Sequence, residues 1–557
     1  MVRRIFLTLH REIRSLHEAA YFLGLFALLS ALLALVRDRL LAHSFGAGGL
    51  LDVYYAAFRI PDMVFVSVAS MVSIYALIPF LNRENDELHQ KRFVGHVLSA
   101  FLFFITVLSV ALFFLVPYVT PFLFPGLVGS AHFDSLITLT RLLLLQPIVL
   151  GVSNIFGSVT QVYGRFVLYG LAPLLYNVGI IIGVLFFYPV FGIMGLGYGV
   201  ILGALFHAGI QTPFIVAHGF LHRVTSRFDF KELKEIVFLS LPRTLALSLQ
   251  HLALLFLVAL ASLMAEGSIT VFNFSLNLQA VPLSIIGASY SVAAFPTLAR
   301  LVSNGNRGEF ISHMLTAARH IVFWSTPIVI LFIVLRAQIV RVILGSGAFD
   351  WADTRLTAAL LALFVFSLIA QGLVLLFVRG YYALGKTRLP LAVNAFSAGL
   401  TVVFAYGFLE AFRSAELFRY FFESLFRIED VTGTEVLMLP LAFSCGMFVN
   451  AGIFWFLFQR DTHEFSRPIS RVFFEVLSAS VVMGFVVHQL LDFFDDIFDI
   501  NTFWGIFAQG FFSGIIGIVA GIVLLKLLGN REIKEIQHHL LHKFWKTPTV
   551  GQEQTEL

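Results

Sequence analysis

The segment from residue 32 to residue 62 combines a long apolar run with charged side chains whose chemistry suits an anion. A charge at the centre of a bilayer costs roughly 2.5–3.5 kcal/mol on insertion scales, so such side chains normally face a partner or a water-filled cavity. Arginine suits a phosphate because its planar guanidinium donates two parallel hydrogen bonds. We therefore predict a polar cavity that binds an anionic headgroup, with these candidate binding residues: Arg37, Asp38, Asp52, Arg59, Asp62 and, further along the chain, Arg243.

Each candidate also has a structural alternative. Arg37 and Arg243 could form structural pairs or extend towards the membrane surface, and Asp38 could simply fix its neighbour Arg37. Asp52 follows "FGAGGLL" and could cap the second membrane span. The remaining two, Arg59 and Asp62, flank a proline that would kink the helix around it.

The composition places these residues in a membrane protein. Of the 557 residues, 59% are hydrophobic and 13% are charged, whereas soluble domains carry about 25% charged residues. The formal net charge is +4, which could indicate nucleic acid, yet the Lys and Arg residues lie in loops between apolar runs. Orientation in a bilayer explains this distribution better, so we expect no nucleic-acid partner.

Apolar runs long enough to cross a hydrocarbon core of about 30 Å recur along the chain. They predict an all-α protein with about fourteen transmembrane helices, near residues 20–42, 54–80, 94–118, 136–160, 166–188, 191–217, 235–263, 268–295, 312–336, 355–382, 388–412, 434–458, 471–493 and 501–528. Positive residues concentrate in alternate connections, which indicates that both termini are cytoplasmic. The exceptions are Arg341 and an insertion at 413–433 that holds Arg413, Arg419 and Arg427.

The chain also repeats itself. "YALIPFLNREN" resembles "VAAFPTLARLVSNGN", with their prolines 296 − 79 = 217 residues apart. "FDSLITLTRLLLLQP" resembles "FDWADTRLTAALLALF" at 349 − 133 = 216, and "QVYGRFVLYGLAP" resembles "YYALGKTRLPLAV" at 385 − 164 = 221. Three matches in one order predict two parallel, pseudo-symmetric six-helix lobes around a central cavity.

The predicted organisation follows from these boundaries. We expect a cytoplasmic amphipathic segment at 1–19, an N-lobe at 20–217, a cytoplasmic linker at 218–234, a C-lobe at 235–458, a helix pair at 471–528 and a cytoplasmic tail at 529–557. The glycine-rich "GIMGLGYGVILGA" lies within an apolar span, where close helix packing explains it better than a phosphate loop.

No catalytic constellation is visible in the sequence. We find no nucleophile–base arrangement, zinc motif or nucleotide loop, and the single Cys445 is read as a core residue. We therefore expect a transporter that is not an enzyme, has no cofactor or bound metal, and is driven by the membrane potential or by an ion that the sequence does not identify.

At "RDRLLAHSFGAGGLLDVYYAAFRIPD" the sequence resembles the MurJ (MviN) lipid II flippases of the multidrug/oligosaccharidyl-lipid/polysaccharide exporter superfamily. That family's first two spans read R-D-x-x-x-A-x-x-F-G-A-G-x-x-x-D-x-[YF]-x-x-A-F, and the chain fits from Arg37 to Phe58. "LTRLLLLQP", "NVGIIIG", "GIMGLGYGVILGALFHAGIQTP", "LPRTLALSLQ", "VPLSIIGASYSVAAFPTLA", "GAFDWADTRLTA" and "RGYYALGKTRLP" extend the resemblance, in family order, to about residue 395.

This resemblance implies export of an undecaprenyl-pyrophosphate-linked disaccharide pentapeptide across the bacterial plasma membrane for peptidoglycan synthesis and cell shape. It implies that Arg37 contacts the pyrophosphate, that Asp38 and Asp52 are functionally sensitive, and that the last two helices form a groove for the lipid tail. The chain departs from the family pattern where cavity cations or a Glu-Gly motif are usual: at Ala31, at Phe65, around Ser70 and Met71, and at Asn277.

Two further readings stay open. One is a flippase for another polyprenyl-linked glycan, and the other is a non-transporting membrane scaffold of envelope synthesis. For partners we expect the lipid-linked oligosaccharide and membrane lipids, with the chain acting as a monomer that can work beside cell-wall synthesis proteins.

Overall fold

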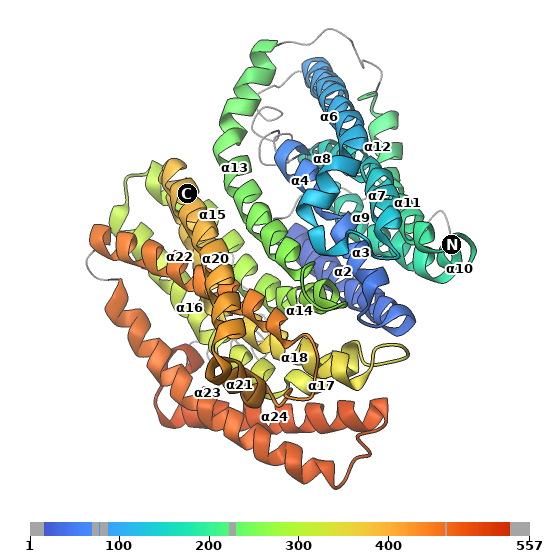
Figure 1. Ribbon diagram of the computed structural model, residues 1–557. Coiled ribbons are helices and arrows are strands. Elements are labelled where there is room, and N and C mark those ends of the chain that lie inside the picture. The colour runs from blue at the N-terminus through green and yellow to red at the C-terminus, as the bar shows by residue number, and fades with distance from the viewer. Residues whose placement is uncertain (1–15, 70–76, 78–86, 222–229, 463–464, 535–557) are drawn as a thin grey trace, which may run out of the picture. The chain divides into compact units, whose positions relative to one another are not determined.

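The computed structural model describes residues 16–69, 77, 87–221, 230–462 and 465–534, and the regular elements in this part of the chain are all helical (Figure 1). Ten helices in it are long and apolar enough to cross a membrane, or eleven with the bent pair Trp351–Phe366 and Leu368–Ala383. The all-α prediction is thus confirmed. The number fourteen stays a prediction, because the spans expected at 20–42, 54–80 and 235–263 coincide with helices that do not meet this test over the described residues.

The chain divides into two compact units. Unit 1 comprises Met1–Val281, Ile343–Phe364 and Lys386–Asn450, and unit 2 comprises Pro282–Val342, Val365–Gly385 and Ala451–Leu557. Each unit is therefore discontinuous in sequence. These boundaries differ from those of the predicted lobes, which stay a prediction.

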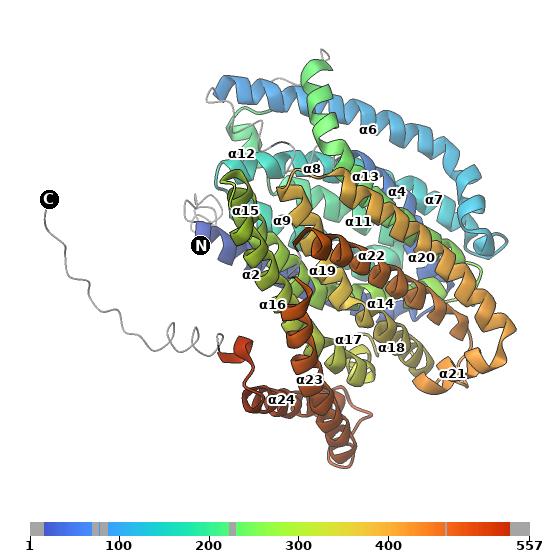
Figure 2. The same cartoon turned by 90° about the vertical axis from the view of Figure 1, so that its left-hand side faces the viewer.

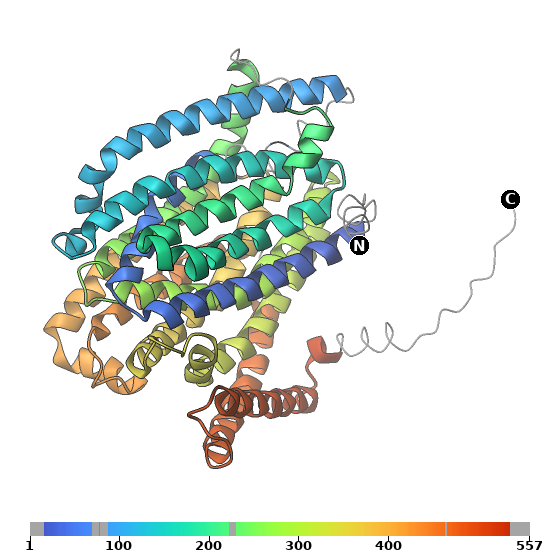
Figure 3. The ribbon, with the colours of Figure 1, turned by 90° about the vertical axis from the view of Figure 1, so that its right-hand side faces the viewer.

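The first part of unit 1 consists of helices that run from the N-terminus to the long connection after residue 217. They are α2 (Leu16–Phe45), α3 (Gly49–Ala57), α4 (Arg59–Val64), the π-helical turn η1 (Phe65–Ala69), α6 (Glu87–Leu123), η2 (Pro125–Leu127), α7 (Phe133–Leu143), α8 (Leu145–Val162), α9 (Phe166–Ile182), η3 (Gly183–Phe187), α10 (Tyr188–Phe191), α11 (Ile193–Gly209) and α12 (Thr212–Ala217). In Figure 3 the dark-blue α2 runs alongside the teal helices, and α9 packs between α2 and α11.

Glycines allow α9 and α11 to approach closely. A Cβ atom on Gly179 would lie 2.2 Å from the Cα of Gly203, and one on Gly183 would lie 2.6 Å from the Cα of Gly199. Real side chains cannot occupy such positions, so the two backbones touch through these glycines. The packing interpretation of the glycine-rich segment is thereby confirmed.

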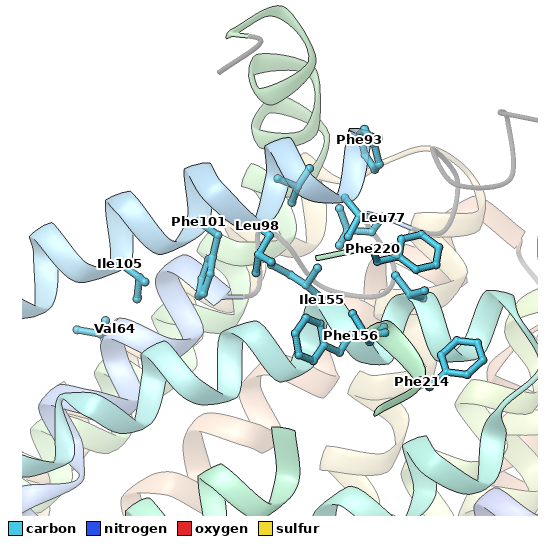
Figure 4. Close-up of a cluster of buried hydrophobic side chains, with 14 of the residues drawn as sticks. Val64, Leu77, Phe93, Leu98, Phe101, Ile105, Ile155, Phe156, Phe214 and Phe220 are labelled. Atoms are coloured by element: carbon cyan, nitrogen blue, oxygen red, sulfur yellow. The ribbon is translucent and has the colours of Figure 1, made fainter. Parts of the chain in front are cut away.

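A cluster of buried aromatic and aliphatic side chains holds α6 against α8 (Figure 4). Phe101 and Ile105 of α6 belong to this cluster together with Ile155 and Phe156 of α8, and all four are at most 4% exposed. Between spans in a membrane such packing stabilises through van der Waals contact, because lipid tails are as apolar as the side chains. This cluster gives the first part of unit 1 its core.

The rest of unit 1 joins two later segments to these helices. It includes α13 (Phe230–Ala261), α14 (Ser268–Leu283) up to Val281, most of α18 (Trp351–Phe366), α20 (Arg388–Ser414), α21 (Glu416–Phe426), η5 (Thr434–Leu437) and the first half of α22 (Met438–Thr462). α13 packs against α20 and against η1.

Unit 2 contains the helices that follow α14 and those at the C-terminal end. They are η4 (Ser284–Ala288), α15 (Ser289–Ser303), α16 (Arg307–Val334), α17 (Arg336–Ile343), α19 (Leu368–Ala383), the second half of α22, α23 (Ser466–Asp495) and α24 (Phe503–Leu527). α23 packs against α16 and α24, as Figure 1 shows in orange and red.

Local geometry supports the internal repeat. Gly164 and Gly385, which the sequence matched, have φ values of 68° and 71°, and each donates its N–H to the carbonyl three residues earlier at 3.0 Å. The π-helical turns η1 and η4 begin 284 − 65 = 219 residues apart, close to the spacing of the sequence matches. Such turns are rare, and this pair repeats at the spacing of the sequence matches, whereas the third π-helical turn, η3, has no counterpart at that spacing, where α20 is α-helical.

Candidate functional site

Arg37 and Asp38 form an ion pair near the C-terminal end of α2. Nε and Nη2 of Arg37 donate to Oδ1 of Asp38 at 2.9 and 2.7 Å, and Nη1 donates to Oδ1 of Asn177 on α9 at 3.0 Å. The Arg37 side chain keeps 19% of its surface exposed, whereas the carboxylate of Asp38 keeps 3%. The guanidinium is thus held in place by two helices, and the side chain as a whole keeps part of its surface exposed.

Two asparagines of α14 complete this polar cluster. Nδ2 of Asn277 donates to Oδ2 of Asp38 at 3.0 Å, and Arg59 of α4 donates through Nη2 to Oδ1 of Asn273. Asn273 and Asn277 are four residues apart and therefore lie on one face of the helix. The side chains by which α14 contacts the charged groups of α2 and α4 are thus neutral amides. At position 277 the sequence resemblance led us to expect an arginine.

The cluster contains polar atoms without a partner in the described part of the chain. They are Nε of Arg59 and the hydroxyl of Tyr55, which are buried. A buried polar group that makes no hydrogen bond costs about 1–3 kcal/mol. A hydrogen bond from either group to a ligand or to water would remove that cost. Asp62 lies one turn after Arg59 on the same short helix.

Asp52 has a different partner from the one the sequence suggested. Its Oδ1 accepts hydrogen bonds from the N–H and hydroxyl of Thr270 at 2.8 and 2.7 Å, and its Oδ2 accepts from the N–H of Gly267 at 2.7 Å. Gly267 lies just before α14 and Thr270 lies in its first turn, where backbone N–H groups have no helical acceptor. Asp52, which belongs to α3, therefore caps α14 and not the second predicted span at 54–80.

The capping is reciprocal. Glu266, just before α14, accepts from the N–H of Gly49, the first residue of α3, at 2.7 Å. Asp353 of α18 accepts from the N–H of Ala47 at 3.0 Å. Gly267 (φ 89°) allows the close approach, since a Cβ there would lie 2.4 Å from the carbonyl oxygen of Ala47. Carboxylates thus cross-link the starts of α3 and α14 within unit 1.

The sequence-based candidates divide into three groups. Arg37 and Asp38 meet directly, Arg59 joins them through α14, and Asp52 lies apart in the capping arrangement. Arg243 belongs to α13, but its side chain lies outside the described residues. Sequence reasoning missed two contributors, Asn177 and Asn273, although polar amides within apolar spans were a signal that could have found them.

A helical bundle with many membrane-length helices and a charged cluster that joins several of them is typical of polytopic membrane proteins. Solved structures agree on the fold. "Lipid II flippase MurJ, inward closed conformation" matches with a TM-score of 0.70 at 20% identity, covering 93% of this chain and 99% of that one. An inward-facing multidrug resistance MATE family transporter of the MOP superfamily matches with a TM-score of 0.62 at 16% identity, covering 80% of this chain and 95% of that one.

The family follows from sequence comparison. The model for "Lipid II flippase MurJ" matches residues 41–508, so the chain belongs to the MurJ family. A probable lipid II flippase MurJ of Haemophilus influenzae is 26% identical over 93% of this chain and 99% of its own length. The lipid II flippase MurJ of Burkholderia cenocepacia is 22% identical over 84% and 89%. The chain is accordingly a polytopic inner-membrane protein of a transporter family.

Proposed function

We propose that this chain moves lipid II, the undecaprenyl-pyrophosphate-linked disaccharide pentapeptide, from the inner to the outer leaflet by alternating access. The relatives named above are called lipid II flippases, and the family resemblance of the first two spans points to the same substrate. The termini face the cytoplasm in this proposal, and the chain works without an enzymatic step or cofactor.

The observation that carries the proposal is the Arg37 guanidinium. It is held between α2 and α9 by Asp38 and Asn177 and keeps 19% of its side chain exposed. Asp38 offsets the cost of placing this arginine among apolar helices, and the exposed part of the side chain remains available to a second anion. A pyrophosphate supplies paired oxygens that match the guanidinium fork. Asp38 sets the orientation of that fork, and Arg59 offers its unpartnered Nε to the same ligand.

The capping arrangement supplies a closing device in this mechanism. Asp52 and Glu266 tie the start of α14 to the start of α3, and these helices come from the two predicted lobes. While the caps hold, those helix ends stay together; when the lobes rock apart, the capped N–H groups must find water. The headgroup would then leave through the opened end while the lipid tail stays in the bilayer, along α23 and α24.

A depletion experiment tests the function. A bacterium depleted of its own lipid II flippase is given this chain, and lipid II in the outer leaflet is measured with a lipid II-cleaving colicin or a fluorescent binder. We expect restoration by the unaltered chain and its loss in Arg37→Ala, with partial activity in Arg37→Lys, which keeps the charge and loses the fork. Membrane abundance of each variant is measured in parallel.

The outcomes separate the alternatives. Restoration that survives Arg37→Ala would show that the guanidinium does not bind the headgroup. Absence of restoration by an abundant, folded chain would refute lipid II as the substrate and favour another polyprenyl-linked glycan or the scaffold role. Asn277, the neutral amide beside Asp38, favours the first of these, because a less cationic site suits a less anionic headgroup. In that case Asn277→Arg should restore lipid II transport.

A further inference from the structure

The insertion at 413–433 contains a helix whose residues divide among three environments. α21 (Glu416–Phe426) exposes large apolar side chains over one arc: Leu417 at 82%, Tyr420 at 62%, Phe421 at 57% and Leu425 at 54%. A second arc turns inward, where Phe422 is 8% exposed and stacks edge-on with Phe418. Successive residues differ by 100°, so these arcs adjoin without overlapping.

The third arc is charged. It carries Glu416, Arg419 and Glu423, of which the last two form an i,i+4 pair at 3.8 Å. Glu423 also accepts a hydrogen bond from the hydroxyl of Thr434 at 2.6 Å. One helix therefore offers one arc to the protein, one to water and one to an apolar medium, which is the pattern of a helix lying in a membrane interface. Tyr420, with its polar tip, borders the charged arc, as interfacial aromatics do.

The neighbouring spans place this helix at membrane level. α20 has 27 residues (Arg388–Ser414), which gives it a length of about 40 Å, enough to cross a core of about 30 Å. α21 begins two residues later, as Figure 2 shows at the end of α20. The chain then returns through the span Thr434–Thr462, so both ends of the insertion lie at one membrane surface.

Ion pairs tie the insertion to neighbouring helices. Arg355 of α18 donates to both carboxylate oxygens of Asp430 and to the carbonyl of Arg427 at 2.7 Å. The Arg355 hydrogen bond holds the pKa of Asp430 below its usual range, so this carboxylate stays ionised at neutral pH. On the other side Arg413 pairs with Glu435 at 2.9 Å.

We propose that α21 is an interfacial anchor, with Leu417, Phe421 and Leu425 inserted among the acyl chains of the leaflet at the C-terminal end of α20. Its occupant is the lipid surface itself, and the anchor fixes the membrane level of the α18 end to which it is tied. This proposal does not depend on which lipid-linked substrate the chain carries.

Spin-label accessibility tests the proposal in the full chain. Because Cys445 is the only cysteine, Cys445→Ala provides a background for single cysteines at 416, 417, 419, 421, 422 and 425. Each variant is labelled with a nitroxide and placed in lipid nanodiscs, and collision with oxygen and with a water-soluble nickel chelate is measured. Val403→Cys on α20, where the native side chain is 63% exposed, is the lipid-facing control.

We expect labels at 417, 421 and 425 to favour oxygen, but less strongly than the label at 403, which lies nearer the middle of a span. Labels at 416 and 419 should favour nickel, and the label at 422 should meet neither reagent. The proposal is wrong if 417, 421 and 425 favour nickel, or if neither reagent reaches them, which would indicate a protein covering this arc. As a second readout, the unaltered chain is irradiated in lipids with acyl-chain diazirines. Labelling of peptide 416–427 is expected, and its absence counts against insertion.

Discussion

The reciprocal caps between α3 and α14 should be unequal in strength. Asp52 is 3% exposed and accepts three hydrogen bonds, whereas Glu266 is exposed and accepts one. Asp52→Ala leaves two backbone N–H groups of α14 without an acceptor, at about 1–3 kcal/mol each. We therefore expect this substitution to cost about 2–6 kcal/mol locally.

Two further substitutions separate the contributions of the individual hydrogen bonds. Asp52→Asn keeps one oxygen for Thr270 but turns an amide N–H₂ towards the N–H of Gly267, so its cost should be about 1–2 kcal/mol. Glu266→Gln alters an exposed contact and should cost less than about 1 kcal/mol, as exposed charged contacts do. The expected order is Asp52→Ala, then Asp52→Asn, then Glu266→Gln.

Hydrogen exchange measures this local stability directly. The amides of Gly267 and Thr270 should be protected in the unaltered chain, and a loss of about 2 kcal/mol raises their exchange rate roughly thirtyfold where local opening controls exchange. Hydrogen-exchange mass spectrometry of the peptide 266–274 in nanodiscs measures this exchange rate, with peptide 145–162 of α8 as an internal reference. Unchanged exchange at 266–274 in Asp52→Ala would refute the capping argument.

Two other predictions concern packing and a buried ion pair. Gly199→Leu should destabilise the protein by about 1–3 kcal/mol or more through overpacking, because a Cβ at position 199 would lie 2.4 Å from the Cα of Gly183. The control is Gly209→Leu in the same helix, where a Cβ would have nothing within 4 Å. Thermal unfolding in detergent compares the two variants, and equal melting temperatures would contradict the prediction. Glu532, whose side chain is 1% exposed, pairs with Arg319 at 2.5 Å. Glu532→Ala should therefore cost about 3–5 kcal/mol and lower the melting temperature. Arg471→Ala, which removes the exposed pair with Glu475, should leave the melting temperature unchanged. Similar losses in both variants would show that burial of the Arg319 pair does not matter.

Much of the fold was predictable because hydrophobic length and repeat spacing act over whole helices. The fourteen predicted spans all fall on helical segments of the structure, wherever residues are described. What hydrophobic length alone did not predict were breaks within spans, such as the one at Leu144 between α7 and α8. Pro147 supplies the local cause of this break, because it has no N–H to bond the carbonyl of Leu143 and its ring crowds that carbonyl.

The site was predictable to a lesser degree. Charges in apolar runs stand out, which is why Arg37 and Asp38 were found. The partner of Arg37 is Asn177 and that of Arg59 is Asn273. Both are neutral, and a neutral amide within a span costs little enough to escape notice. The role of Asp52 depended on which helix start comes within hydrogen-bonding distance, and Gly267 lies 267 − 52 = 215 residues away. Local sequence around Asp52 could not supply that pairing.

The charges of the cluster lead to a last prediction about the driving force. With all four groups ionised, Arg37 and Arg59 are balanced by Asp38 and Asp62. The empty site is then neutral, and a bound pyrophosphate makes it negative. An inside-negative potential favours outward movement of negative charge by about 2.3 kcal/mol per charge per 100 mV, while return of the neutral empty site is not opposed.

Flipping in proteoliposomes should therefore accelerate when a potassium diffusion potential makes the cytoplasmic side of the protein negative, and slow when the sign of the potential is reversed. In Asp62→Asn the empty site gains a positive charge, so the loaded site becomes less negative and the acceleration should shrink. A rate that is insensitive to potential in both proteins would mean that a counter-ion travels with the headgroup and cancels its charge.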